Sequence, residues 1–255
     1  MKTKTLLQKL SKQFPKRLAK ENDDYVGLMV GKLPMEVNKI LLCLDCDDEV
    51  FETIKVEKPD LILTHHPFIY GPKAHVLNND PIKKALYDKL EALNYPVYSM
   101  HTNFDTGKGG MNDALASALE LEDVQVVEGC KMMRGGKLKK EMEVEEFARY
   151  AKEKLNLDFA LLLPYGRKSV RSVAVVGGAG SGLFIYAKDA GYDIYLSGDI
   201  PHHVRRYIVN NKYNYLDIPH EVERIFMPTM KKILLEMDPS LEIVIVDHEK
   251  MAKVI

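Results

Sequence analysis

The apolar residues in the first half of the chain alternate between helix-like and strand-like spacing. At the N-terminus, one set follows the spacing of an amphipathic helix that Pro15 interrupts: Leu6, Leu7, Leu10 and Phe14. Short apolar runs predict three buried strands, at residues 38–45, 60–64 and 96–100. Gly109 and Gly110 then turn the chain into a helix expected over 112–121.

Asp80 and Pro81 mark the start of a further helix. Aspartate is a favoured N-cap, and proline is favoured at the first helical position. Apolar residues would give this helix one buried face: Ile82, Leu86, Leu90 and Leu93. Strands separated by helices indicate parallel β-α-β units, so the pattern predicts an α/β fold.

The second half repeats this alternation from Val124 onward, and no low-complexity linker separates the halves. Strand-like runs occupy residues 124–127, 159–163, 171–176, 193–196, 213–218 and 241–246. Helices are expected at 144–155, after the glycine-rich run 177–182, through His202 and His203, and from His220 with a bend at Pro228.

Composition and charge narrow the class of protein. The 255 residues are 46% apolar and 29% charged, as in ordinary globular proteins. A net charge of −1, from 36 basic and 37 acidic residues, argues against a dedicated nucleic-acid binder. No apolar run approaches the roughly 18 residues of a membrane span. The charged start also lacks the apolar core of a signal peptide, so we expect a cytoplasmic protein without membrane association.

Cys43 and Cys46 form a C-x-x-C pair, which raises the question of a redox or zinc site. The only other cysteine is Cys130, so one chain cannot supply a four-thiolate zinc site. Because Cys43 lies in an apolar run, the favoured interpretation is a buried thiol on a strand.

His65 and His66 end the predicted strand 60–64, immediately before Pro67. Neighbouring side chains on a strand point to opposite faces, but the chain leaves the pleat before a proline, so both rings could face one cavity. The carboxyl ends of parallel strands are where such sheets bind ligands. His101 and Asp105 follow the next strand at the same edge, and Asp105 would add an oxygen ligand. An alternative is a loop aspartate in an Asx-turn.

His220 and Glu223 open a predicted helix. Residues three apart share a helical face, so this pair could reach one ion or two neighbouring ions. An acidic residue in a first helical turn is also an ordinary complement to the helix dipole.

Together these residues resemble one protein family, the GTP cyclohydrolase 1 type 2 homologues, also called NIF-three-like proteins. The resemblance covers nearly the whole chain, in DDYVGLMVG (23–31), THHPFIYGPK (64–73), HTNFDTGKGGMNDAL (101–115), VAVVGGAGSG (173–182), SGDIPHH (197–203) and the element from His220 to Glu223. The paired histidines, HTNFD and the GGMND turn are specific to it, whereas the glycine loop is not.

The resemblance implies a dinuclear metal site with five ligands: His65, His66, Asp105, His220 and Glu223. It also implies two interlinked α/β domains, with mixed or parallel sheets flanked by helices, and a toroidal homohexamer. This ligand set suits two divalent ions of zinc, iron, manganese or nickel. Two such cations would share a hydroxide for cyclohydrolase-like or phosphoester hydrolysis of a small molecule. His101 would then ligate, orient Asp105 and the water, or move a proton.

For His220 and Glu223 to meet the early ligands, the end of the chain must return to its first half. We therefore expect a discontinuous metal-site domain, 1–123 plus 216–255, with an inserted second domain at 124–215. Many family members have a glycine before the last histidine and a step of four to the glutamate. Here Pro219 precedes His220 and the step is three, so Glu221 remains an alternative to Glu223.

A second hypothesis is a ring-shaped, non-catalytic scaffold that binds nucleic acid or regulatory proteins, with structural metals. Its support is a segment of interleaved basic and aromatic residues: Arg205, Arg206, Tyr207, Lys212, Tyr213 and Tyr215. Two amphipathic elements would give the same pattern, and this interpretation is favoured.

The remaining polar motifs have structural interpretations. The glycine run 177–182 lacks both the dinucleotide spacing and a P-loop lysine, which favours a tight turn. Asp199, His202 and His203 could contact substrate, although the solvated start of a helix is the favoured interpretation.

Overall fold

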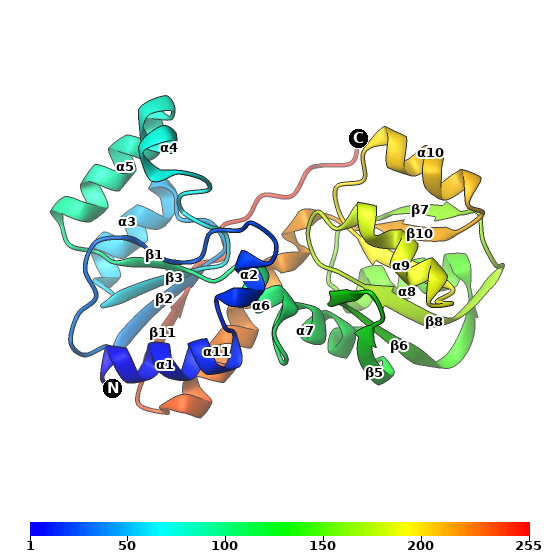
Figure 1. The fold of residues 1–255 in the computed structure, drawn as a ribbon, viewed down its shortest axis with the longest axis horizontal. Coiled ribbons are helices and arrows are strands. Elements are labelled where there is room, and N and C mark those ends of the chain that lie inside the picture. The colour runs from blue at the N-terminus through cyan, green and yellow to red at the C-terminus, as the bar shows by residue number, and fades with distance from the viewer. The chain divides into compact units, whose positions relative to one another are not determined.

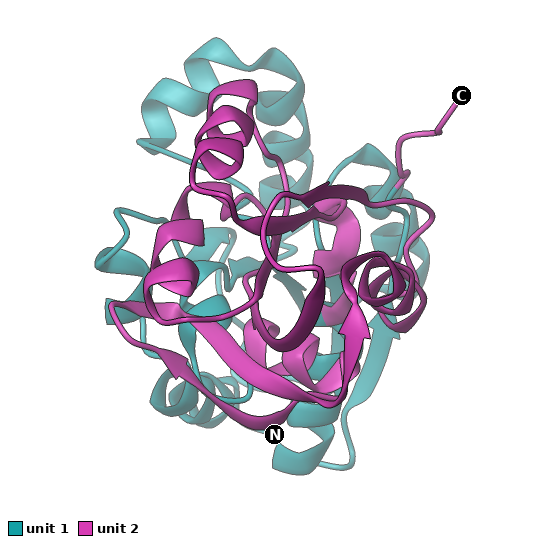
Figure 2. Ribbon diagram, turned by 90° about the vertical axis from the view of Figure 1, so that its right-hand side faces the viewer, with its two compact units in different colours: residues 1–110, 226–249 teal, residues 111–225, 250–255 magenta.

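The computed structural model describes residues 1–255 and divides into two compact units (Figure 2). Unit 1 contains residues 1–110 and 226–249, and unit 2 contains residues 111–225 and 250–255. Each unit is built around its own sheet. The structure contains no helix with the length and apolar character needed to cross a membrane.

The sheet of unit 1 has five strands in the order β1-β4-β3-β2-β11 (Figure 1). They span Gly27–Val30 (β1), Val97–Ser99 (β4), Leu61–Thr64 (β3), Lys39–Cys43 (β2) and Glu242–Ile245 (β11). All neighbours pair in parallel except β1, which runs antiparallel to β4 at one edge. Cys43 is level with Thr64, and Thr64 with Ser99. The residues after these three strands therefore leave the sheet at the same end.

Helices cover both faces of this sheet, with α3 and α5 on one face and α1 and α11 on the other (Figure 1). The helices of unit 1 are Thr3–Gln13 (α1), Arg17–Lys20 (α2), Asp48–Glu57 (α3), Lys73–Asn79 (α4), Pro81–Ala92 (α5), Thr102–Thr106 (α6) and Phe226–Met237 (α11). Asp80 caps α5 as predicted, because its carboxylate accepts from the Lys83 amide.

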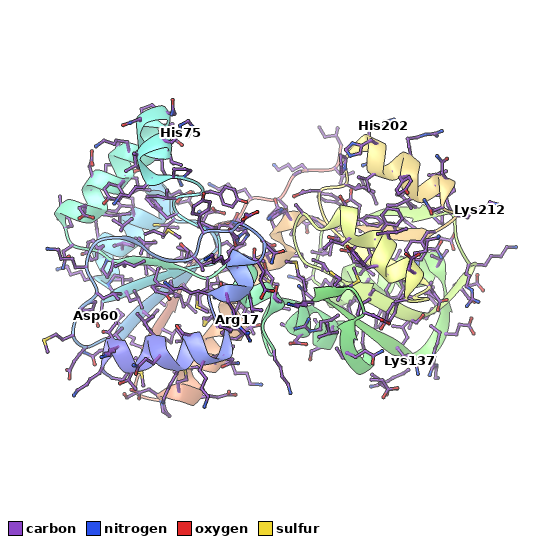
Figure 3. The ribbon with its side chains drawn as sticks, in the orientation of Figure 1. Arg17, Asp60, His75, Lys137, His202 and Lys212 are labelled. Carbon is purple, nitrogen blue, oxygen red and sulfur yellow. The ribbon has the colours of Figure 1, made fainter.

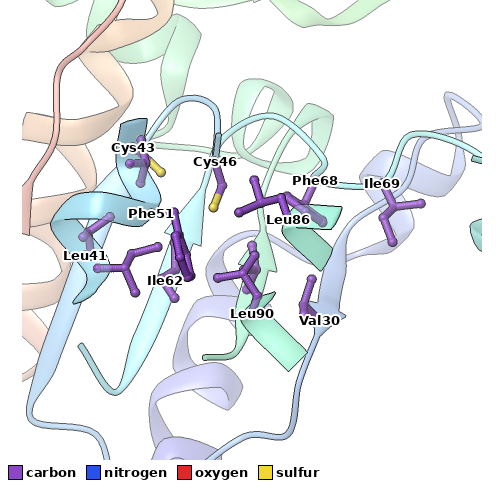
Figure 4. Close-up of a cluster of buried hydrophobic side chains, with 13 residues drawn as sticks. Val30, Leu41, Cys43, Cys46, Phe51, Ile62, Phe68, Ile69, Leu86 and Leu90 are labelled. Atoms are coloured by element: carbon purple, nitrogen blue, oxygen red, sulfur yellow. The ribbon is translucent and has the colours of Figure 1, made fainter. Parts of the chain in front are cut away.

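An apolar cluster fills the space between the sheet and helices α3 and α5 (Figure 4). Phe51, Leu86 and Leu90 of the helices meet Leu41 and Ile62 of the strands. Cys43 and Cys46 belong to the same cluster as buried free thiols, which confirms the structural interpretation of the C-x-x-C pair. Burial raises the pKa of the Cys46 thiol to about 12, so it stays protonated and unreactive at neutral pH.

The sheet of unit 2 has six strands in the order β5-β6-β8-β9-β10-β7. They span Glu122–Val127 (β5), Cys130–Glu143 (β6), Ser169–Val175 (β8), Ile194–Ser197 (β9), Asn214–Asp217 (β10) and Leu161–Pro164 (β7). The central strands β8, β9 and β10 are parallel, and the outer pairings are antiparallel.

Five helical segments complete unit 2: Met111–Ala118 (α7), Val144–Lys154 (α8), Ser181–Leu183 (η1), Phe184–Asp189 (α9) and His202–Asn210 (α10), followed by the 3₁₀ segment His220–Ile225 (η2) before α11. α7 and α8 pack against β6 and β8. Phe184 of α9 and Ile208 of α10 lie in a second apolar cluster with Tyr195 and Tyr215 of the strands.

The predicted fold class is confirmed, since both units are α/β with mixed sheets flanked by helices. The predicted apolar face of α5 is only half right: Leu86 and Leu90 are buried, but Ile82 is 74% and Leu93 55% exposed. Ile82 lies in the first turn, four residues before Leu86, and Leu93 follows the last helical residue.

Strand β6 was not expected from the sequence, because its 14 residues carry charges and glycines in place of an apolar run. Gly135 within it has a packing role, since a Cβ there would lie 2.1 Å from the Tyr192 ring. The boundaries of the units also differ from the expected 123/124 and 215/216. They fall at 110/111 and 225/226, because α7 and η2 pack within unit 2.

Asp217 at the end of β10 generates a prediction for pH dependence. Burial raises its pKa from 3.8 to about 6, although the Ile200 amide and Arg205 favour the charged form. Between these two pH values the folded chain holds a proton that the unfolded chain has lost, so Asp217 makes stability fall as pH rises. Asp217→Asn should therefore stabilise the protein above pH 6, by on the order of 1–3 kcal/mol.

The check is urea unfolding of both proteins from pH 4 to pH 7 in the presence of a chelator. The stability gained by Asp217→Asn should grow through the window and level off above it. A difference that does not change with pH would contradict the burial argument.

Candidate metal centre

The end of strand β3 delivers two histidines to one edge of the unit 1 sheet. The Thr64 hydroxyl donates to the His66 carbonyl at 2.8 Å and is hydrogen-bonded to the Ser99 hydroxyl at 2.8 Å. These side-chain bonds add to the backbone pairing just beyond the strand. The His65 and His66 amides still donate to the carbonyls of Cys43 and Leu44. The chain is thus fixed at the point where both imidazoles leave the sheet.

Three imidazoles gather at this edge: His65 and His66 after β3, and His101 after β4. Each offers a nitrogen, and these nitrogens lie within 4.8 Å of one another. The ring centroids of His65 lie 5.1 Å from those of both His66 and His101. Imidazole nitrogens at this spacing, brought together from the ends of two strands, are a suitable group to hold a divalent ion.

Each of these rings is oriented through its Nδ1 atom by an oxygen that can only accept. His65 Nδ1 donates to the Met100 carbonyl at 3.0 Å, His66 Nδ1 to Asp45 at 2.7 Å and His101 Nδ1 to Asp24 at 2.8 Å. A neutral imidazole that donates from Nδ1 has its lone pair on Nε2. The arrangement therefore sets the tautomer in which Nε2 can ligate a metal.

The carboxylates that orient His66 and His101 are both held in the charged form. Burial disfavours ionisation of Asp24, but hydrogen bonds from His101 and Thr102 outweigh it and lower its pKa to about 2. Burial and His66 act on Asp45 in the same opposed way, and its pKa is also lowered. Asp24 therefore remains an acceptor at neutral pH, and its hydrogen bond with His101 is retained.

Asp105 lies beside His65, with 3.5 Å between its Oδ1 and His65 Nε2. The residues HTNFD form helix α6, with His101 as N-cap, in place of the Asx-turn loop that was one expectation. Asn103 fixes this short helix by donating to the Phe14 carbonyl at 3.0 Å. His101 is bonded to Asp24 and belongs to the same group as His65 and His66.

Unit 2 carries the other predicted ligands on the 3₁₀ segment η2. His220 Nε2 lies 3.1 Å from Glu223 Oε2, and His220 Nδ1 lies 2.5 Å from Asp199 Oδ2. The hydrogen bond to Glu223 is the main cause of a pKa near 9 for His220, and Asp199 adds to it against the effect of burial. Glu223 is buried and faces this imidazole, which distinguishes it from the half-exposed Glu221.

The glycine run after β8 makes room for Glu223. Gly178 has a φ of +63°, and a Cβ there would lie 2.1 Å from Glu223 Oε1. Ser197 fixes the turn by accepting from the Gly180 amide at 2.9 Å and donating to the Gly178 carbonyl at 3.0 Å. The run is therefore a tight turn that accommodates the carboxylate.

Sequence reasoning missed the carboxylates that orient the histidines: Asp24, Asp45 and Asp199. Asp45 ends the predicted strand 38–45, so its position at the same sheet edge was an available signal. Asp199 had been assigned to a solvated helix start, but it has a φ of +55° and contacts His220. Asp24 had no signal beyond the DDY resemblance, because the contact with His101 spans 77 residues.

The other candidate residues play no part in these groups. His75 on α4 and His202 on α10 are exposed (Figure 3). In the basic and aromatic segment, Tyr213 and Tyr215 are buried in the unit 2 core, so only Tyr207 presents a ring to solvent. This segment is therefore two amphipathic elements, and its buried tyrosines cannot stack on bases.

Comparison with known proteins agrees with the resemblance found in the sequence. A model of the Duf34/NIF3 (NGG1p interacting factor 3) family matches residues 1–251. A protein of Clostridium perfringens named GTP cyclohydrolase 1 type 2 homolog is 32% identical over 242 residues, covering 91% of each chain. One of the same name from Methanocaldococcus jannaschii is 30% identical over 257 residues, covering 97% of this chain and all of its own.

Solved structures share the fold. A Bacillus cereus protein related to NIF3 has a TM-score of 0.87 at 20% identity, with 100% of this chain and 99% of that chain covered. Reduced HcgD from Methanocaldococcus jannaschii has a TM-score of 0.81 at 28% identity, with 97% and 98% covered. The predicted NIF-three-like fold is thus confirmed, and the chain belongs to the Duf34/NIF3 family.

Proposed function

We propose that this protein is a metal-dependent hydrolase with a dinuclear centre. In this proposal His65, His66 and Asp105 of unit 1 and His220 and Glu223 of unit 2 hold two divalent ions together. The orientation of the histidines carries the proposal. His65, His66 and His101 have Nδ1 bonded to an acceptor within unit 1, which directs Nε2 toward ligation, and Asp199 orients His220 through its Nδ1 in unit 2.

The donor set fits a catalytic ion better than a purely structural one. Structural zinc sites are usually closed shells rich in cysteine, whereas these groups contain only imidazoles and carboxylates and the thiols are buried elsewhere. Divalent ions held here would supply Lewis acidity and lower the pKa of a coordinated water. In this proposal His101, which is hydrogen-bonded to the charged Asp24, accepts or returns a proton.

The substrate class follows from the chemistry and from the names of relatives. Relatives are named GTP cyclohydrolase 1 type 2 homolog, which makes ring-opening hydrolysis of a heterocycle one reaction to test. Phosphoester hydrolysis is the other, since two neighbouring cations suit an in-line displacement at phosphorus. The homohexamer implied by the resemblance stays a prediction, which sedimentation of the native protein would test.

The metal content of the native protein tests the proposed dinuclear centre. Native protein should contain about two divalent ions per chain by elemental analysis. His66→Ala removes a ligand of unit 1 and Glu223→Gln one of unit 2. If the units share one centre, each variant should lower the content to one ion or fewer and abolish hydrolysis, because each disturbs both ions.

The double variant His66→Ala/Glu223→Gln separates a shared centre from two independent ones. With a shared centre, the double variant should lose fewer ions per chain than the two single variants lose in sum. With independent ions, the losses of the two single variants should add. Asp88→Ala is the control, since this exposed carboxylate pairs only with Lys84 in the same unit. Additive losses, or native metal content in both single variants, would contradict the proposal.

Another prediction concerns the carboxylates that orient the rings. Asp45→Asn and Asp199→Asn should each weaken metal binding by about 10- to 100-fold, because the imidazole loses its charged acceptor while the ligands remain. Competition with a chromogenic chelator measures the affinity. Asp88→Asn should leave it unchanged, and native affinity in both orienting variants would show that Nδ1 bonding is incidental.

A further inference from the structure

A groove of about 920 Å³ in unit 1 lies away from the histidines. Helix α1 forms one wall and contributes Leu7 and Ser11. Leu28 of β1 and residues 33–36 after it form the other, and Tyr98 of β4 completes the lining. This volume is in the range of pockets that bind small molecules.

The walls of the groove leave apolar side chains uncovered. Leu28 is 42%, Leu33 38% and Met35 91% exposed. Exposed apolar residues gathered in a concave surface indicate a binding site more often than scattered ones do. An apolar body of a ligand would remove this surface from water.

The lining is also strongly basic. Four lysines contribute to it: Lys2, Lys4, Lys12 and Lys16. Glu36 is the only acidic residue in the lining, so the groove has a formal charge of +3 (4 − 1) in a chain whose net charge is −1. The Lys16 ammonium lies 5.4 Å from the centroid of the Tyr98 ring, where it is held beside the apolar wall. The charge is thus complementary to an anionic group.

We infer that this groove binds an anionic amphiphile, a small molecule with an elongated apolar chain and an acidic head group. Lys12 and Lys16 bind the head, and the chain lies along Leu7, Leu28 and Leu33. This site uses none of the proposed metal ligands, so the test of this inference is independent of the test of the proposed hydrolase.

The test is calorimetric titration of the full-length protein with dodecanoate below its critical micelle concentration, with dodecanol as the neutral partner. Dodecanoate should bind saturably and at least about tenfold more tightly than dodecanol. Lys12→Gln/Lys16→Gln should weaken the affinity for dodecanoate by about tenfold, because two exposed ion pairs are lost. The matched control is Lys9→Gln/Lys20→Gln, in neighbouring lysines outside the groove, which should stay within about twofold.

Leu28→Glu tests the apolar wall in a half-exposed position that tolerates a polar side chain, with circular dichroism to confirm folding. It should abolish binding of both probes while leaving metal content unchanged. Absence of saturable binding, or equal affinity for both probes, would overturn the inference. A change in sedimentation mass with Leu28→Glu would overturn it too, because a second copy of the chain would then be the occupant.

Discussion

The parallel pairing of β2, β3 and β4 is the constraint on which the unit 1 site depends. Cys43, Thr64 and Ser99 are level in the sheet, so the residues that follow emerge at one edge. Asp45, His66 and His101 come from different strands and still meet there. An antiparallel partner in place of either neighbour would send one of these residues to the opposite end.

Hydrogen bonding to Nδ1 determines which imidazole nitrogen can ligate a metal. An imidazole free to rotate presents either nitrogen, and its tautomer is then set by solvent. Here a carbonyl or a charged carboxylate accepts from Nδ1 of His65, His66, His101 and His220. These acceptors hold the rings in one orientation before any ligand arrives, which lowers the entropy cost of binding.

The two units position their candidate side chains through different structural elements. In unit 1 the strand end and helix α6 position the side chains. In unit 2 a glycine turn and a 3₁₀ segment do so, and Gly178 is required because a side chain there would occupy the place of Glu223. The apolar groove beside α1 depends on neither arrangement, which is consistent with a separate role for that face of unit 1.

The sequence by itself determined the elements whose signals are local. Apolar runs identified β2, β3 and β4, and the Asp80-Pro81 pair identified the start of α5. The family-specific histidines and HTNFD were enough to name the candidate ligands. The sequence did not predict strand β6 or the exposure of Ile82. The pairing of a charged strand and the burial of a helix face depend on the neighbouring elements.

Only the tertiary structure decided which groups orient the candidate ligands. Asp24 reaches His101 across 77 residues, and Asp199 reaches His220 across 21 through a backbone in the left-handed region. No periodicity encodes such contacts, since they arise from the register of strands and the path of loops. Local sequence therefore supplied the candidate ligands, and long-range packing supplied the acceptors that orient them.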